Sequence, residues 1–225
     1  GPIYFKSNIN TTLSGGTGSE SGGNYSVAAS ANLSNGVGSY EPYISVLNIG
    51  GNIDINVKSY SSANYGFVVA EYGTTSPITA YGDINISSTG VTGAGVGLMY
   101  LTSTMTSTIG NITLSATSTS SSATTNAGIS GTSTGTITAT AGSVTINSSA
   151  NASSAVALAG KVTAARGITI NGTGTTAATI VSLGALAITG DGDILVTANN
   201  SAAGANTGIN QSGTITLTSG SDITF

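Results

Sequence analysis

Residues 82–86 read GDINI, and this short phrase decides the fold because it recurs along the chain. Its variants are GNIDI at 51, GNITL at 110, GSVTI at 142, RGITI at 166, GDILV at 192 and SDITF at 221. Successive phrases start 24 to 32 residues apart, with a mean spacing of about 28 residues. Every second residue within a phrase is apolar, which predicts a strand with one buried face.

Each phrase is followed by two further short apolar segments. After the phrase at 110 they are AGISG (127–131) and GTITATA (135–141). After the phrase at 142 they are AVALAG (155–160) and KVTAA (161–165). Turns rich in Gly, Asn and Ser separate them, and no apolar spacing of three and four predicts a helix. Three short strands per repeat predict an all-β, right-handed parallel β-helix (β-solenoid) with one repeat per coil and a period of about 28 residues.

The repeat also predicts how the chain is organised. Residues 1–50 are expected to form less regular N-terminal coils or a cap, and residues 51–225 the regular β-helix repeats of one continuous solenoid. TSTI (106–109) is expected as the third strand of its coil. The stretches SATSTSSSATTN (115–126) and NSSANASS (147–154) are expected to be surface loops, because they are long and polar.

Charged residues are unusually rare, at 4 Lys and Arg and 8 Asp and Glu among 225 residues, with a net charge of −4. An average domain is about 25% charged, so Ser, Thr, Asn and Gly must coat this surface. Four scattered basic residues form no basic patch, which argues against nucleic acid as a partner. No apolar run reaches the roughly 18 residues of a membrane span. Without Cys, a disulfide framework and a thiolate metal site are excluded.

Residues for catalysis are equally scarce. The chain has no His to serve as general base and no Cys nucleophile, and its Ser residues have no partner base in a recognisable motif. We therefore expect no enzymatic activity, no cofactor and no metal. Asp193 aligns with Asp83 and Asn52 at the start of the repeated strand, where each is expected to cap backbone amides at a corner. The alternative is a polysaccharide-acting enzyme on the same solenoid, which requires paired carboxylates in a groove.

Two threonine-rich runs raise a second alternative, an ice-binding or extracellular-matrix protein. They are TSTMTST (102–108) and TITAT (136–140). Such a function requires a flat Thr array. The runs are expected to fall on different strands without repeating in register, and Thr is a common residue on exposed strands.

Aromatic residues gather in the first part of the chain, where eight of the nine tyrosines lie at or before position 81. Tyrosine offers a flat apolar face and a polar tip, which suit sugars and protein partners. The candidate ligand contacts are Tyr60, Tyr65, Glu71, Tyr72 and Tyr81. The alternative is that these tyrosines cover an irregular N-terminal cap or pack between coils.

The phrase G-[DN]-I-x-[IL] and its small-residue spacers, as in residues 110–146, resemble the filamentous-haemagglutinin-like adhesins over roughly residues 50–225. These include the high-molecular-weight adhesin type. The resemblance implies a segment of a large secreted or surface-displayed bacterial adhesin, exported by two-partner secretion through an outer-membrane transporter. Its partner would be a glycan or protein receptor on a host or neighbouring cell, with the segment acting as stalk or as receptor-binding region.

The same resemblance implies glycosylation at Asn-x-Ser/Thr sequons. The candidate acceptors are Asn85, Asn111, Asn147, Asn151 and Asn171. A shared preference of Asn, Ser and Thr for turns explains the sequons equally well.

Overall fold

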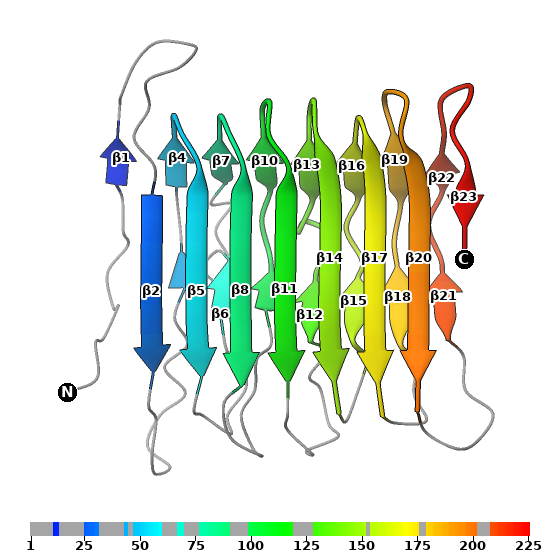
Figure 1. Ribbon diagram of the computed structural model, residues 1–225, viewed down its shortest axis with the longest axis horizontal. Helices are drawn as coiled ribbons and strands as arrows, with labels where there is room; N and C mark the ends of the chain where they lie inside the picture. The colour runs from blue at the N-terminus through cyan, green and yellow to red at the C-terminus, as the bar shows by residue number, and fades with distance from the viewer. Residues whose placement is uncertain are drawn as a thin grey trace.

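The computed structural model describes residues 11–13, 25–31, 43–44, 47–59, 67–69, 77–90, 99–118, 128–151, 154–175, 179–201 and 208–225. Within these ranges the chain forms 23 parallel β-strands in three sheets and no helix. Figure 1 shows long strands running down the near face and short strands returning up the far face as the chain advances from N to C. This path is a right-handed coil, so the predicted parallel β-helix is confirmed.

Each coil contributes one strand to each of the three sheets. The long sheet holds the strands of the repeated phrase: β2 (Tyr25–Ala31), β5 (Ile53–Ser59), β8 (Ile84–Gly90), β11 (Ile112–Ser118), β14 (Ser143–Ala150), β17 (Gly167–Gly174), β20 (Asp193–Asn200) and β23 (Ile223–Thr224). The middle sheet follows in the chain: β3 (Tyr43–Ile44), β6 (Phe67–Val69), β9 (Met99–Leu101), β12 (Ile129–Gly131), β15 (Val156–Leu158), β18 (Val181–Leu183) and β21 (Ile209–Gln211). The return sheet completes the coil: β1 (Thr11–Leu13), β4 (Leu47–Ile49), β7 (Ile78–Ala80), β10 (Met105–Ser107), β13 (Ile137–Ala139), β16 (Val162–Ala164), β19 (Leu186–Ile188) and β22 (Ile215–Thr216).

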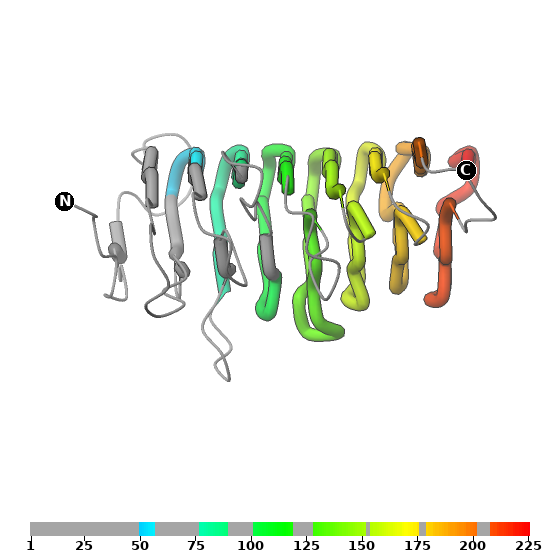
Figure 2. The backbone as a smooth tube through the Cα atoms, turned by 90° about the horizontal axis from the view of Figure 1, so that it is seen from below, coloured from blue at the N-terminus to red at the C-terminus, as the bar shows by residue number. Residues whose placement is uncertain are grey.

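Figure 2 shows the coils stacked one beside the next. The strands pair in register, so equivalent residues of successive coils form columns. Ile112 pairs with Ile84 on one side and with Val144 on the other. All three side chains are 0% exposed. Full burial of such a side chain contributes about 1.5–3 kcal/mol. Alternate apolar residues of the repeated phrase therefore form the core, which continues from coil to coil.

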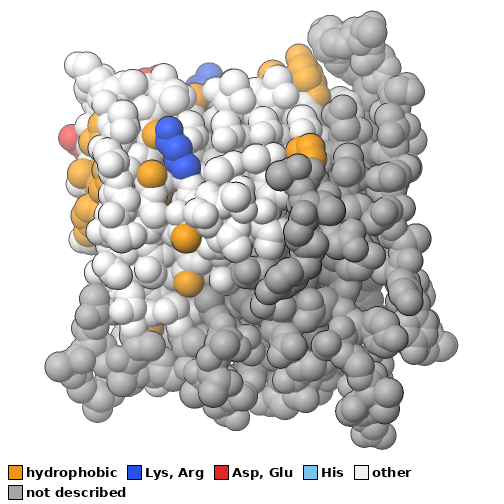
Figure 3. All heavy atoms as spheres, turned by 180° about the vertical axis from the view of Figure 1, so that it is seen from behind, with side chains coloured by type: hydrophobic (Ala, Val, Ile, Leu, Met, Phe, Trp, Pro, Cys, Tyr) orange, Lys and Arg blue, Asp and Glu red, His pale blue; other side chains and the backbone are white. Residues whose placement is uncertain are grey.

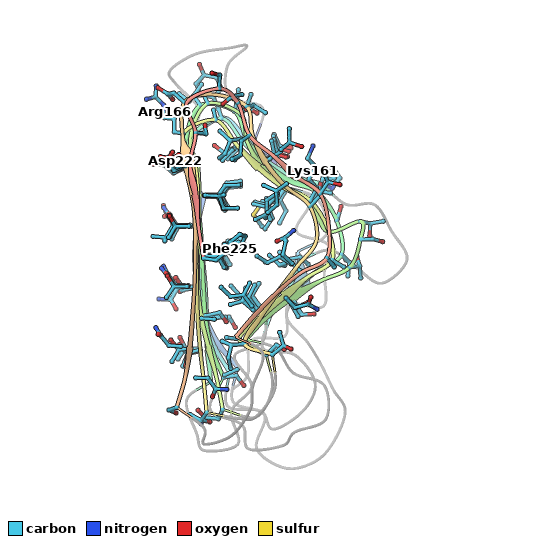
Figure 4. All side chains as sticks on the ribbon, turned by 90° about the vertical axis from the view of Figure 1, so that its right-hand side faces the viewer. Lys161, Arg166, Asp222 and Phe225 are labelled. Carbon is cyan, nitrogen blue, oxygen red and sulfur yellow. The ribbon has the colours of Figure 1, made fainter. Side chains whose placement is uncertain are left out.

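The cross-section narrows toward the end of the long strands, where the middle sheet approaches the long sheet (Figure 4). Small residues point inward there, such as Ala116, Ser148 and Gly172. A Cβ placed on Gly172 would lie 2.5 Å from Val181 Cγ2. The Ser148 hydroxyl donates to the Ala155 carbonyl at 2.6 Å, which satisfies it in the interior.

This narrowing corrects the two predicted loops. Residues 115–118 belong to β11 and residues 147–150 belong to β14, where burial still alternates. The inward residues are small or hydroxylated because the space is small, so the sequence resembles a polar loop. Residues 119–126 and 152–153 of the predicted loops lie outside the described residues.

The third strand of the coil before the phrase at 110 was also misplaced. It is β10, and TSTI (106–109) overlaps only its last two residues. Met105, which is 1% exposed, stacks between Ile78 and Ile137 and sets the register. Ile109 lies at the following corner, 54% exposed, with its amide donating to the Tyr81 carbonyl at 2.9 Å.

The glycine of the phrase allows adjacent coils to approach closely at the corner. A Cβ placed on Gly142 would lie 2.1 Å from the Gly110 carbonyl oxygen. One placed on Gly192 would lie 2.0 Å from the carbonyl carbon of Arg166. In the RGITI variant the glycine moves one position on, to Gly167, whose φ of 146° favours glycine. The glycines therefore recur because backbone lies directly against backbone.

The Asn or Asp that follows this glycine links one coil to the next. Its side-chain oxygen accepts a hydrogen bond from the amide at the same position of the next coil. The pairs are Asp83 N–H to Asn52 Oδ1 (2.8 Å), Asn111 N–H to Asp83 Oδ1 (2.7 Å), Ser143 N–H to Asn111 Oδ1 (2.9 Å) and Asp222 N–H to Asp193 Oδ1 (2.8 Å). The predicted capping role of Asn52, Asp83 and Asp193 is confirmed.

Candidate functional site

Most of the predicted tyrosine-rich contact region lies outside the described residues. This applies to Tyr60, Tyr65, Glu71 and Tyr72. Tyr81 is described, half-buried at the corner between β7 and β8. The tyrosine-rich site therefore stays a prediction.

Charged side chains are sparse on the described surface. Arg166 is exposed and its Nε donates to the Ala141 carbonyl at 3.0 Å, which places it along the corner. Lys161 is exposed directly before β16, away from Arg166 on the cross-section of the coil (Figure 4). Within the described ranges, no group of three or more His, Cys, Asp or Glu side chains is arranged to hold a metal ion. Figure 3 shows the face opposite the long sheet. On the described part of this face, charged side chains (blue and red) are few beside hydrophobic (orange) and other uncharged (white) ones.

The long sheet presents a flat outer face, because its strands overlay in a straight line when viewed down the coil axis (Figure 4). Its outward residues form three columns of Asn, Ser and Thr from β8 to β17. The first column is Asn85, Thr113, Thr145 and Thr169, the second is Ser87, Ser115, Asn147 and Asn171, and the third is Thr89, Thr117, Ser149 and Thr173. We call these twelve residues the hydroxyl grid.

The hydroxyl grid is regular in both directions. Neighbouring strands are about 4.8 Å apart and alternate residues along a strand about 6.6 Å apart. Asn171 Nδ2 donates to Asn147 Oδ1 at 2.9 Å, so amides within a column bind one another. None of the twelve side chains is charged. The first column continues beyond the grid in both directions. On the N-terminal side Asn85 Nδ2 donates to Asp54 Oδ1, and on the C-terminal side Thr169 pairs with Leu195, which is 42% exposed.

A second Thr column runs along the return sheet and corrects an expectation from the sequence. Thr106, from the first threonine run, pairs directly with Thr138 from the second. Thr79 precedes them and Thr163 follows, so four successive coils carry Thr at this position. The expectation that these runs would not repeat in register was wrong, because buried neighbours such as Met105 and Ile137 fix the register.

Register explains why the sequence analysis missed the grid. Each of its rows begins within the repeated phrase and continues past it, as in Thr145-x-Asn147-x-Ser149. The signal was therefore present as alternate polar residues continuing past the phrase. It was visible only if those residues were assigned to the strand and not to a loop.

All five candidate glycosylation acceptors lie on or beside the long sheet. Asn85, Asn147 and Asn171 point outward from its strands, and Asn111 lies at the corner before β11. The amide nitrogens of Asn85 and Asn171 already donate along their columns, to Asp54 and Asn147. Asn151 is exposed directly after β14. All five stay candidates.

Comparison with known proteins adds no identification. No protein-family model, curated protein or solved structure matches the chain. In the described ranges we also find no helix with the length and apolar character needed to cross a bilayer.

Proposed function

We propose that this chain is a segment of a secreted or surface-displayed bacterial adhesin that attaches the cell to a host or neighbouring cell. The observation that carries the proposal is the unbroken register of the three parallel sheets over successive coils. Seven intervals of about 4.8 Å give the eight-stranded sheets a length of about 34 Å. A solenoid grows by adding coils, which provides reach without a larger core.

The sequence supports the same proposal. The G-[DN]-I-x-[IL] phrase resembles that of the filamentous-haemagglutinin-like adhesins, which implies export through an outer-membrane transporter. A sparsely charged surface of hydroxyls and amides offers many hydrogen-bonding groups to a glycan or protein receptor. The segment acts as a stalk or as a receptor-binding region, with the tyrosine-rich stretch and the hydroxyl grid as the two candidate contact surfaces.

The test is binding of the chain, immobilised on beads, to cultured epithelial cells and to a glycan array. Saturable binding that the free chain competes away is the expected result for a receptor-binding region. Absence of binding to every cell and glycan would contradict that version and restrict the segment to a stalk.

Two matched triple variants locate the contact. One is Tyr60→Ala/Tyr65→Ala/Tyr72→Ala, and the other is Thr113→Ala/Thr145→Ala/Thr169→Ala. Loss of binding in the tyrosine variant alone assigns the contact to the tyrosine-rich stretch. Loss in the threonine variant alone assigns it to the grid. Equal, full binding by both variants would exclude both surfaces.

A second candidate function is ice binding, which the in-register threonines favour. The grid and the return-sheet column hold Thr at fixed spacing on rigid strands, and the grid is flat (Figure 4). Regularly spaced hydroxyl and methyl groups can hold water in an ordered lattice. Thermal hysteresis of the dissolved chain tests this function.

A pair of lysine variants sharpens the ice-binding test. Thr145→Lys places a long charged side chain in the middle of the grid, and Thr163→Lys does the same on the return sheet. Hysteresis that is lost in the first variant and retained in the second assigns ice binding to the grid. Absence of hysteresis in the unmodified chain contradicts the function.

A further inference from the structure

The protein itself leaves most of the hydroxyl grid unused. Nine of the twelve grid residues are Ser or Thr, and among the described residues none of these nine hydroxyls has a hydrogen-bond partner. Hydroxyls near the turns differ. Thr134 Oγ1 donates to the Thr102 carbonyl at 2.9 Å. Thr175 Oγ1 donates to the Asn151 carbonyl at 2.7 Å. Because every grid side chain is half-buried or exposed, the grid presents free donors and acceptors to solvent.

The charges around the grid indicate what kind of ligand it accepts. The next strand, β20, extends the uncharged columns with Leu195, Thr197 and Asn199. On the other side β5 carries one charge of each sign in register with the grid, at Asp54 and Lys58. Carboxylates line the corner where the long strands begin, at Asp83, Asp193 and Asp222. These carboxylates repel an acidic ligand, and the grid holds no cation to attract one. The face therefore favours a neutral ligand.

The shape of the grid favours a ligand that is itself flat and regular. The long strands overlay in a straight line, so the face has no groove that could enclose a single chain (Figure 4). Along the coil axis its residues repeat every 4.8 Å or so, and its columns lie about 6.6 Å apart. One sugar of an extended β-1,4-linked polysaccharide has a length close to the spacing along the axis. Such polysaccharide chains pack side by side into fibres, whose surfaces present hydroxyls at regular intervals in two directions.

An ordered fibre fits this surface better than a soluble polysaccharide chain does. A soluble chain loses conformational freedom at each linkage that becomes fixed on the grid, whereas a fibre is already ordered. Each hydrogen bond to a sugar hydroxyl contributes little net free energy, because water competes for the same groups. Tight binding therefore requires many such bonds at once, which two rigid and regular surfaces provide. The Thr methyl groups and Leu195 add contacts for the apolar faces of the sugar rings.

We propose that the hydroxyl grid binds the flat surface of a neutral, fibrous β-1,4-linked polysaccharide, with the sugar chains lying along the coil axis. This inference rests on the adhesive function proposed above and names the class of receptor. Grid hydroxyls and amides exchange hydrogen bonds with sugar hydroxyls over several successive coils. The solenoid then attaches its parent cell to the polysaccharide of a wall or extracellular matrix.

Co-sedimentation of the 225-residue chain with microcrystalline cellulose and with chitin tests the proposal. Both fibres are neutral and β-1,4-linked. We expect saturable retention that persists when the salt is raised to about 1 M, where charges are screened beyond about 3 Å. Absence of retention on both fibres overturns the proposal. Retention that disappears at high salt also overturns it, because binding would then depend on charge.

Two further carbohydrates test the two properties assigned to the ligand. Cellulose oxidised to carry surface carboxylates is the same fibre with negative charge, and it should retain several-fold less protein. Soluble cello-oligosaccharides are the same sugar without order, and they should compete only weakly with the fibre. Equal or tighter binding to the oxidised fibre overturns the preference for a neutral ligand. Full competition by the oligosaccharides at equal sugar concentration overturns the preference for an ordered one.

A valine variant tests whether the grid hydroxyls make the contact. Thr113→Val/Thr145→Val/Thr169→Val removes three hydroxyls of one column and keeps the methyl groups and the strand preference of the residues. Its affinity for the fibre should fall by about tenfold or more, because three hydrogen bonds are lost. Unchanged affinity of this variant overturns the assignment to the grid.

The matched control carries the same three substitutions on the return sheet, as Thr79→Val/Thr106→Val/Thr138→Val. This control should bind the fibres as the unmodified chain does, and an equal loss in both valine variants overturns the assignment. Thr145→Lys provides a second test, because a long side chain in the middle of the grid holds a flat fibre away from it. Unchanged retention of this variant contradicts the proposal.

Comparison with the cell-binding test separates this proposal from the adhesin proposal. Beads that bind epithelial cells or array glycans saturably, with no retention of the chain on either fibre, overturn the fibre assignment and leave the adhesive function in place. Absence of binding to cells, array and fibres contradicts both the fibre assignment and the receptor-binding version of the adhesin. Retention on the fibres that is lost in the grid valine variant supports both.

Discussion

At the scale of single residues, two positions of the repeated phrase hold the coils together at one corner. The glycine brings backbone against backbone, and the following Asn or Asp accepts an amide hydrogen bond from the next coil. Any side chain at the glycine position would keep the two backbones apart. Leu or Lys at the next position would offer no acceptor to the amide. The coils of a chain with so few charges are thus held in specific contact by two features. One is the short acceptor side chain of Asn or Asp, and the other is the glycine, which has no side chain to keep the backbones apart.

Gly142→Ala tests the close approach. The added Cβ would lie 2.1 Å from the Gly110 carbonyl oxygen, so the coils must separate, at a cost of about 1–3 kcal/mol in the free energy of unfolding. Urea denaturation measures this loss. The control is Gly208→Ala. Among the described residues its Cβ meets only Ala198 Cβ, at 3.7 Å, so it should change stability by less than about 1 kcal/mol. Equal effects of the two substitutions would contradict the steric explanation.

Asn111→Ala tests the amide cap. It leaves the Ser143 amide without its acceptor at 2.9 Å and should lower the free energy of unfolding by about 1 kcal/mol. A matched pair at the equivalent position of a later coil keeps the acceptor. Asp193→Asn retains an oxygen for the Asp222 amide at 2.8 Å and should keep most of the stability that Asp193→Ala loses. An Asp193→Asn variant as unstable as Asp193→Ala would show that the cap contributes nothing.

At the scale of the strand, side chains alternate between a buried inner face and an outer face exposed to solvent. The two faces have different roles. The inward residues of β14, such as Val144 and Ile146, are 0% exposed and form the core. The outward residues Thr145 and Asn147 belong to the hydroxyl grid. Substitutions on the inner face should therefore change stability, and those on the outer face should change surface properties.

Adjacent positions in β14 make this prediction quantitative. Ile146→Ala removes a fully buried side chain and should cost about 2–5 kcal/mol in the free energy of unfolding. Thr145→Ala lies on the outer face and should change it by no more than about 0.5 kcal/mol. Urea denaturation of both variants measures the contrast. A larger loss in the free energy of unfolding from Thr145→Ala than from Ile146→Ala would contradict the assignment of the inner and outer faces.

The sequence predicted the fold because its strands carry large apolar residues at alternate positions, as in Ile84 and Ile86. It failed where the buried residues are small. Ala116 and Ser148 point inward but occur in stretches that resemble loops. The threonine columns also escaped prediction, because alignment of Thr106 with Thr138 depends on how the coils stack and not on either strand alone. The tyrosine-rich contact region stays a prediction.

At the scale of the whole molecule, each coil contacts chiefly the coils before and after it. Stability in such a solenoid is a sum of coil and interface contributions. A constant rise per coil is therefore the central claim, because the columns of stacked residues and the hydroxyl grid both depend on it.

The most direct test of that claim measures distances between spin labels along one outward column of the long sheet. Labels at Asp54, Asn85 and Thr113, each paired with a label at Thr224, lie six, five and four coils apart. We predict narrow distance distributions that shorten by about 4.8 Å with each coil removed, from about 29 Å to about 19 Å. Broad distributions, or distances that do not change in equal steps, would contradict the stacked solenoid.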